Sequence, residues 1–199
     1  MKHFSIIVMC LFICAAVVGQ DKTEVPKLWK KAGDFSINFS QVSFSNWAAG
    51  GKNSVSGVAL FNYSANYLKD RVSWDNSLNM GYGLLKEQNR SVVKSEDKME
   101  ISSKVGYKMT EAGKWFFSGL TNFRTQFADG FNYTNKDNPE RISTFFAPAY
   151  LTLAVGFDYK PTDKFTLFMS PLSGKFTFVA DKELADAGAF GVDPGKKSR

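Results

Sequence analysis

Apolar and polar residues alternate with a period of two along most of the chain after Gly33. Between Ser54 and Leu68, one set of alternating positions is mainly apolar and aromatic, and the other set is mainly polar. The same division recurs in four later runs, which are Val72–Leu84, Met99–Met109, Trp115–Phe127 and Phe145–Tyr159. A period of two is typical of a β-strand with one apolar and one polar face.

Two further runs, around Asp34–Phe44 and around Lys164–Val179, complete a set of seven predicted strands. In the last of them, apolar residues occupy odd positions up to Met169 and even positions from Phe176 onward. A β-bulge inserts one extra residue into a strand and therefore produces such a shift. The sequence predicts a bulge near Ser170–Gly174, where a proline and a glycine interrupt the run.

The connections between the predicted strands are alternately short and long. Short connections lie at Lys69–Arg71, Thr110–Lys114 and Lys160–Lys164, and long polar ones lie at Lys86–Lys98 and Asp129–Ser143. An antiparallel meander connected in this way has its tight turns at one end and its long loops at the other, as outer-membrane barrels do. We therefore expect an all-β fold, an antiparallel meander that forms a transmembrane outer-membrane β-barrel.

In such a barrel the apolar face meets lipid and the polar face lines the lumen. The lumen-lining candidates are Asp75, Glu100, Lys104, Lys108, Asn122, Arg124, Gln126 and Asp158. They fit either a pore that selects solutes by charge or a closed plug of ion pairs in a narrow barrel.

Aromatic residues flank each short connection. They are Tyr67, Trp74, Tyr107, Trp115, Tyr159 and Phe165. Rings at the level of the lipid headgroups keep a polar tip in water and an apolar body in lipid. These six residues are the predicted aromatic girdle at the periplasmic interface, with the long loops outside the cell.

The N-terminal segment has the features of a secretory signal. Lys2 and His3 precede an apolar run from Phe4 to Val18, and we place the cleavage after Gly19. The expected organisation is a signal peptide at 1–19, a periplasmic lead-in at 20–33 and a barrel domain at 34–199. Single-chain bacterial barrels have an even number of strands. With seven predicted strands, we expect the barrel domain to be incomplete at its C-terminus.

The composition excludes several kinds of catalytic and metal-binding site. The single histidine is His3, and the two cysteines are Cys10 and Cys14, all within the predicted signal peptide. Without them the mature chain lacks the groups of serine or cysteine triads and of common zinc sites, so we expect no enzyme, metal or cofactor. The formal net charge is +6, but the basic residues are scattered along the chain. Nucleic-acid binding requires clustered basic residues, so no nucleic-acid partner is expected.

Four segments carry a resemblance to a known family. They are Phe44–Gly51, Asn122–Phe127, Ser170–Lys175 and Gly188–Val192. The chain resembles, over most of residues 29–195, an uncharacterised outer-membrane β-barrel family of Bacteroidetes, a domain-of-unknown-function family. The resemblance implies location and architecture, and it transfers no catalytic residue. Within the first segment, Trp47, Gly50 and Gly51 are expected to form a tight loop, with glycine supplying positive φ.

The expected function is a non-enzymatic outer-membrane role, as a pore or transport protein or as an envelope scaffold. Outer-membrane lipid and the barrel-assembly machinery are the expected partners. One alternative is a secreted or periplasmic soluble β-barrel or sandwich that binds a ligand, with the apolar face inward. The other is a barrel hydrolase that works from Asp75, Glu100 or Asp158, which requires two of these carboxylates to converge.

Overall fold

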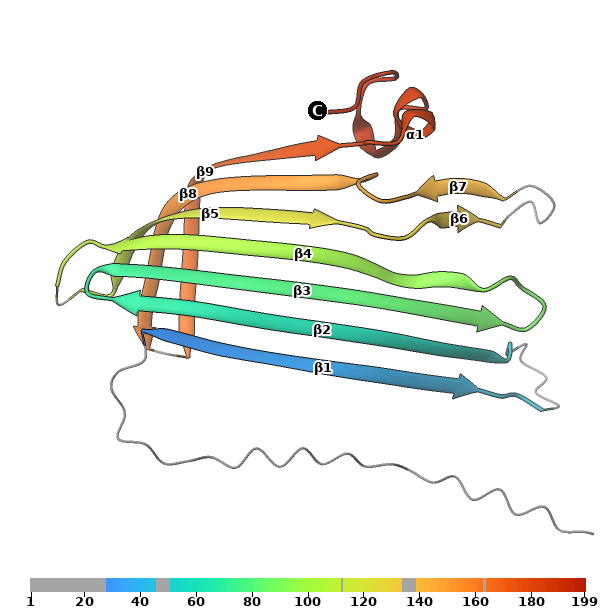
Figure 1. Ribbon diagram of the computed structural model, residues 1–199, viewed down its shortest axis with the longest axis horizontal. Coiled ribbons are helices and arrows are strands. Elements are labelled where there is room, and N and C mark those ends of the chain that lie inside the picture. Colours follow the sequence, from blue (N-terminus) through green and yellow to red (C-terminus); the bar gives the residue numbers. More distant parts are fainter. Residues whose placement is uncertain (1–27, 46–50, 112, 134–138, 163) are drawn as a thin grey trace, which may run out of the picture.

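The protein is all-β, and its main element is one antiparallel sheet of seven strands in the order β1-β2-β3-β4-β5-β8-β9 (Figure 1). The computed structural model describes residues 28–45, 51–111, 113–133, 139–162 and 164–199. The strands of the sheet are β1 (Trp29–Val42), β2 (Ser54–Lys69), β3 (Val72–Glu87), β4 (Val93–Lys108), β5 (Trp115–Thr125), β8 (Ala149–Thr162) and β9 (Phe165–Phe178). A separate hairpin contains β6 (Gly130–Asn132) and β7 (Glu140–Ser143).

The strand register confirms the two predicted faces. Phe35 of β1 lies opposite Phe61, which lies opposite Met80, and Met80 lies opposite Met99 of β4. Directly opposed residues project to the same side of a sheet. The apolar sets of neighbouring strands therefore share one face, and the polar sets share the other.

The predicted bulge in the last strand is also confirmed. Val155 pairs with Leu172 and Phe157 pairs with Met169, so two residues of β9, Ser170 and Pro171, oppose the single residue Gly156 of β8. Bulges bend a strand and increase its twist. In Figure 1 both strands bend strongly, and their turn end lies behind the rest of the sheet.

The predicted all-β antiparallel meander of seven strands is confirmed, but the sheet is not closed, so the transmembrane barrel stays a prediction. Among the described residues, β1 pairs with β2 alone and no pairing joins β1 to β9. In a meander of seven strands the first and last run in the same direction, so they cannot form the antiparallel pair that closes a barrel. The free edge of β9 is partly occupied by its own chain, because Arg199 and Thr177 exchange two backbone hydrogen bonds.

Several boundaries differ from the predicted ones. The first strand begins at Trp29 rather than Asp34, and β3 and β4 extend through most of the expected long connection at 86–98. Lys86–Glu87 and Lys94–Lys98 are polar on both faces, so they show no alternation although their backbones pair. The strand expected from Phe145 begins at Ala149, because Thr144 and Ala147 hydrogen-bond to each other across a tight turn in which Phe146 has a φ of 56°.

A small C-terminal unit follows β9. It contains the helix α1 (Lys182–Asp186) and the 3-10 turn η1 (Ala189–Gly191), and Asp181 caps the helix by accepting from the backbone N–H of Leu184. The buried apolar residues of this unit are Val179, Leu184, Ala185 and Val192, and Ala147 from the turn before β8 belongs to the same cluster. Neither helix in the described part of the chain has the length and apolar character needed to span a membrane.

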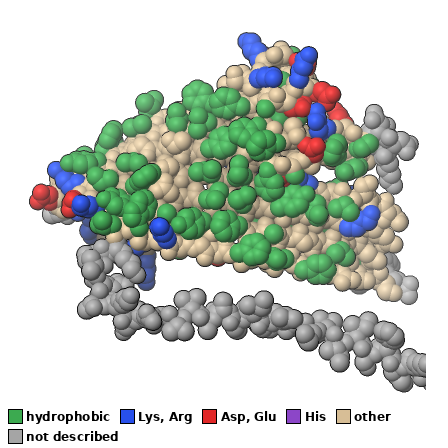
Figure 2. Space-filling view, in the orientation of Figure 1, with side chains coloured by type: hydrophobic (Ala, Val, Ile, Leu, Met, Phe, Trp, Pro, Cys, Tyr) green, Lys and Arg blue, Asp and Glu red, His purple; other side chains and the backbone are tan. Residues whose placement is uncertain are grey.

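The apolar face of the sheet is exposed. Ile37 and Phe39 on β1 are each 71% exposed, and exposed apolar side chains recur on every strand of the sheet. Figure 2 shows these side chains spread over the face turned to the viewer, while charged side chains gather mainly towards its ends. Among the described residues, buried apolar side chains form a cluster at the C-terminal unit, and the sheet adds only Phe116, Ala149 and Ala154.

Candidate functional site

The polar face carries a cluster of four charged side chains, which we call the charge quartet: Asp75 on β3, Lys104 on β4, and Asp158 and Lys160 on β8. Lys104 Nζ lies 2.6 Å from an Asp158 carboxylate oxygen, and Lys160 Nζ lies 2.7 Å from an Asp75 oxygen. The crossed distances are 3.9 Å for Lys104 to Asp75 and 3.6 Å for Lys160 to Asp158. Each lysine therefore contacts both carboxylates.

Strand register explains only part of this cluster. Asp75 and Lys104 are direct cross-strand partners on β3 and β4. Asp158 and Lys160, in contrast, lie on β8, which is separated from β4 by β5. Lys160 reaches Asp75 because the bent part of β8 turns over the polar face (Figure 1). The polar face is therefore the concave side of the sheet, and the exposed apolar face is the convex side.

The quartet is largely removed from water. The Asp158 side chain is 1% exposed and that of Lys104 is 15% exposed. Thr166 Oγ1 donates to Asp158 over 2.8 Å, and Lys160 Nζ also donates to Ser73 Oγ over 2.8 Å. Two positive and two negative charges make the cluster electrically neutral. Close pairing of this kind offsets the cost of removing charges from water.

Aromatic rings complete the surroundings of the two lysines. The Lys160 ammonium group lies 5.3 Å from the centre of the Phe116 ring, and that of Lys104 lies 5.6 Å from the centre of the Phe168 ring. Both distances are within the range of cation–π attraction. Sequence reasoning missed Lys160, Phe116 and Phe168. The sequence predicts a turn at Lys160. Because its position is even, like that of Asp158, it belongs to the polar set of β8.

The other lumen-lining candidates do not join the quartet. Asn122 donates to Glu100 over 2.9 Å, and Lys98 Nζ lies 4.0 Å from the other Glu100 oxygen. Arg124 lies directly opposite Glu100 in the register, but it forms no ion pair with it among the described contacts. Lys108 lies opposite Phe116 near the turn end of β4.

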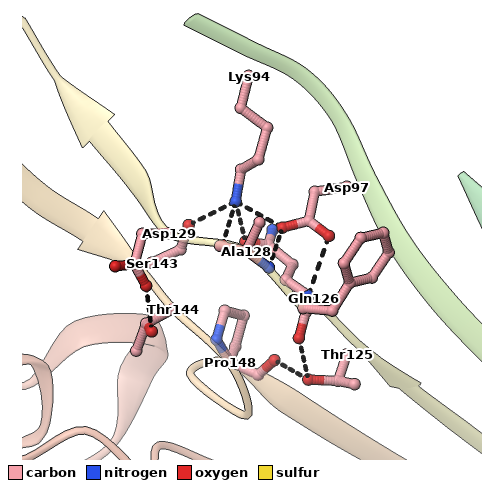
Figure 3. A network of polar contacts seen from close by, with 10 residues as sticks. Lys94, Asp97, Thr125, Gln126, Ala128, Asp129, Ser143, Thr144 and Pro148 are labelled. Atoms are coloured by element: carbon pink, nitrogen blue, oxygen red, sulfur yellow. Dashed lines mark hydrogen bonds and ion pairs between the residues drawn. The ribbon is translucent and has the colours of Figure 1, made fainter. Parts of the chain in front are cut away.

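Gln126 lies outside the sheet, because β5 ends at Thr125. Its side-chain oxygen accepts from Lys94 Nζ over 3.3 Å, within a second polar network (Figure 3). Lys94 Nζ also donates to Ala128 O over 2.7 Å and lies 2.6 Å from Asp97. The prediction of Gln126 as a strand residue beside Arg124 was therefore wrong.

Asp97 is the centre of this second network. Its side chain is 1% exposed and accepts from the backbone N–H groups of Phe127 and Ala128 over 3.0 and 3.1 Å. The carboxylate therefore accepts from two consecutive amides just after β5 ends at Thr125, where the chain leaves the sheet. Lys94 Nζ additionally reaches Ser143 Oγ of β7 over 3.3 Å (Figure 3). The network therefore anchors the β6–β7 hairpin to β4.

The six predicted girdle residues lie at the turn ends of their strands. Trp115 and Tyr159 pack with ring centres 4.6 Å apart, and the Arg71 guanidinium lies 4.8 Å from the centre of the Tyr107 ring. Tyr67 and Trp74 are direct cross-strand partners, and Phe165 follows the turn between β8 and β9. Trp29 packs against both Tyr67 and Trp74, at 5.1 and 5.7 Å, and sequence reasoning had left it outside the girdle.

Of the predicted loop motif, Trp47 and Gly50 lie outside the described residues, as does the predicted signal peptide. At Gly51 the lack of a side chain has a packing reason, since a Cβ there would lie 2.7 Å from the Phe44 ring. The same loop is closed by Asn53, whose side-chain oxygen accepts from the Phe44 N–H over 2.6 Å.

Within the described residues, no group of three or more histidine, cysteine or acidic side chains is arranged to hold a metal ion. The arrangement on the concave face is therefore one of neutralised ion pairs and amide contacts. Such a surface can fill or narrow a channel and can bind polar groups of a solute.

Comparison with known proteins identifies a family of unknown function. A family model described as "Protein of unknown function (DUF3078)" matches residues 39–131. This segment runs from the end of β1 into β6 and includes Asp75, Lys104 and the Lys94–Asp97 pair. Neither the curated proteins nor the solved structures include a significant match to the chain. The match is consistent with an uncharacterised domain-of-unknown-function family, and the outer-membrane and Bacteroidetes parts of the expectation stay predictions.

Proposed function

We propose that the chain forms the wall of an integral outer-membrane β-barrel with a non-enzymatic role. The observation that carries the proposal is the division of the sheet into an exposed, apolar convex face and a polar concave face. Membrane barrels have this arrangement. A soluble barrel or sandwich has the reverse one, with its apolar side chains inside. Soluble monomers rarely expose apolar patches larger than about 600 Å².

In the proposed barrel, the convex face contacts outer-membrane lipid and the concave face lines the lumen. The charge quartet lies near the short turns, which we assign to the periplasmic side together with the N-terminus. Because its four side chains contact each other across the lumen side of β3, β4 and β8, the quartet narrows the passage there. This favours a scaffold or a narrow transport protein over a wide pore. Insertion involves the barrel-assembly machinery.

A carboxylate hydrolase has less support. Asp75 and Asp158 do converge, as that alternative requires, but each contacts both lysines of the quartet. A general acid or base needs a carboxyl group within hydrogen-bond reach of a substrate. Asp158 is almost fully buried, and Glu100 belongs to a separate contact with Asn122. We therefore infer a structural role for these carboxylates.

The proposal is tested by a pair of adjacent substitutions on β4, Ile101→Lys on the convex face and Ser102→Lys on the concave face. A lysine facing lipid near the middle of the bilayer costs about 2–4 kcal/mol, whereas a lysine facing an aqueous lumen costs far less. We expect Ile101→Lys alone to reduce the heat-modifiable, folded fraction after refolding into phospholipid vesicles. Ile101 is already 46% exposed, so in a soluble protein its replacement by lysine is expected to change stability by about 0.5 kcal/mol or less.

Two results would contradict the proposal. One is recovery of the folded full-length chain in the soluble periplasmic fraction, without detergent. The other is equal folding of the two lysine variants in vesicles. Conductance across planar bilayers then separates transport from a scaffold role. If the charge quartet blocks the lumen, the unmodified chain conducts no ions, which supports the scaffold role, whereas ion flux supports transport.

A further inference from the structure

The concave face contains a hollow whose walls are more apolar than the rest of that face. It has a volume of about 450 Å³ and is lined by Ser56, Val58, Leu60, Leu85, Ser95 and Glu96. Three of these six residues are aliphatic, although they stand on the otherwise polar face of β2 and β3. The hollow therefore offers apolar walls within a polar surface, the composition usual for small-molecule sites.

Two glycines of β3 lie directly against the side chains that line this hollow. A Cβ at Gly81 would lie 3.1 Å from Leu60 and 3.0 Å from Glu96, and a Cβ at Gly83 would lie 2.7 Å from Ser95 and 2.9 Å from Val58. A side chain at either position would collide with these lining side chains and displace them. The arrangement of the walls thus requires glycine at two alternate positions of one strand.

A β-bulge lies beside the hollow. The register between β3 and β4 shifts between Gly83 and Leu84, so Ser95 is the extra residue between Glu96 and Lys94. Bulges are frequent next to binding sites because they redirect neighbouring side chains. Here the bulge leaves Glu96 on the concave face and directs Lys94 to Asp97 on the other side.

Glu96 is the one charged group that lines the hollow. No ion pair or hydrogen bond of its carboxylate is found within the described residues. Lys98 stands two residues away on the same face, but its ammonium group lies 4.0 Å from Glu100 instead. A half-buried carboxylate beside aliphatic walls attracts a cation that carries an apolar group.

We propose that this hollow binds a small organic cation with an aliphatic body, of the primary alkylammonium class. The ammonium group donates to Glu96, and the alkyl chain packs between Val58, Leu60 and Leu85. The binding site depends only on β2, β3 and β4, and its assignment to the lumen rests on the proposed function. In the barrel it lies near the long-loop mouth, at the opposite end of β3 from Asp75 and the quartet.

The test is calorimetric titration of the full-length chain with hexylammonium chloride, with hexanol and sodium hexanoate as matched probes. We expect hexylammonium to bind, hexanol to bind more weakly and hexanoate not to bind. Glu96→Gln is expected to weaken hexylammonium binding about tenfold or more, since it removes a charge-assisted hydrogen bond. The control is Asp193→Asn, an exposed carboxylate of the C-terminal unit that pairs with Lys196, which is expected to leave the affinity unchanged.

Filling the hollow provides a second, independent variant. Leu60→Trp occupies the apolar space while keeping Glu96, and we expect it to weaken hexylammonium and hexanol alike. The proposal is overturned if hexylammonium does not bind, or if Glu96→Gln and Asp193→Asn have the same affinity for it. Vesicle insertion, measured separately with the lysine variants of β4, reports on the barrel. Loss of binding and failure to insert are therefore distinguishable.

Discussion

Removal of the buried carboxylate of the charge quartet is the sharpest test of how the concave face is held together. In Asp158→Asn, Lys104 loses a partner at 2.6 Å and Lys160 loses one at 3.6 Å. Both lysines keep Asp75, at 3.9 and 2.7 Å. The substitution therefore leaves two positive charges facing one negative charge in a poorly hydrated part of the molecule.

The expected cost follows from burial. Removal of one partner from a buried ion pair costs about 3–5 kcal/mol, because the remaining charge is left uncompensated. Lys104 and Lys160 are 15% and 23% exposed and retain one carboxylate, so we expect a smaller loss, of about 2–3 kcal/mol. The double variant Lys104→Met, Asp158→Leu leaves the pair Lys160–Asp75 intact. It is expected to cost less than the sum of its single substitutions, with a coupling of about 1–3 kcal/mol.

Urea unfolding of the refolded full-length chain in detergent micelles, followed by tryptophan fluorescence, measures these differences. The matched control is Asp193→Asn, which breaks an ion pair with Lys196 of 3.0 Å whose side chains are 73% and 69% exposed. An exposed pair contributes about 0–1 kcal/mol. Equal unfolding midpoints for Asp158→Asn and Asp193→Asn would refute the view that the quartet stabilises the bend of β8 over the concave face.

Two further predictions concern the loops. Asp97→Ala removes the acceptor of two backbone amides and the partner of Lys94. We therefore expect the free energy of unfolding to fall by about 3 kcal/mol and the hydrogen exchange of those amides to become at least tenfold faster, with exchange in β2 unchanged. Gly51→Ala places a methyl group 2.7 Å from the Phe44 ring and is expected to cost about 1–3 kcal/mol in urea unfolding. Gly119→Ala, whose added Cβ meets nothing within 4 Å, is the neutral control, and equal losses for both glycines would contradict the packing argument.

The two faces and the bulge could be predicted from the sequence, because both follow from the local alternation of apolar and polar residues. Direct neighbours such as Phe61 and Met80 then follow from pairing consecutive strands. Strand ends were less predictable. The prediction of a long loop at 86–98 failed because hydrogen bonds between backbones continue where the side chains are polar on both faces. The prediction for Gln126 failed because Asp97 ends the ladder at Thr125, and no periodicity marks that contact.

The quartet was only partly predictable, for a reason of geometry. Asp75, Lys104 and Asp158 were placed on one face, but their convergence depends on the bend that brings β8 across that face. Lys160 was missed because a residue beside a turn has no assigned face until the strand is known to continue to Thr162. The C-terminal unit was not predicted at all, since a helix of five residues shows too little periodicity to be recognised.

Alternation separates an apolar set from a polar set, but it does not determine which of them is concave. A soluble barrel and a membrane barrel share the same period of two and differ only in this choice. Here the choice is fixed by contacts that only one curvature permits. Lys160 on β8 can reach Asp75 on β3, across two intervening strands, only if the polar face is inside. The apolar residues then lie outside on all seven strands, and the chemistry of so extended an apolar surface supports our proposal of lipid as its partner. The proposal of a membrane barrel therefore depends on the ion pairs that join β8 to β3 and β4 and on the exposed apolar face, and the Asp158 and Ile101 variants test these two parts separately.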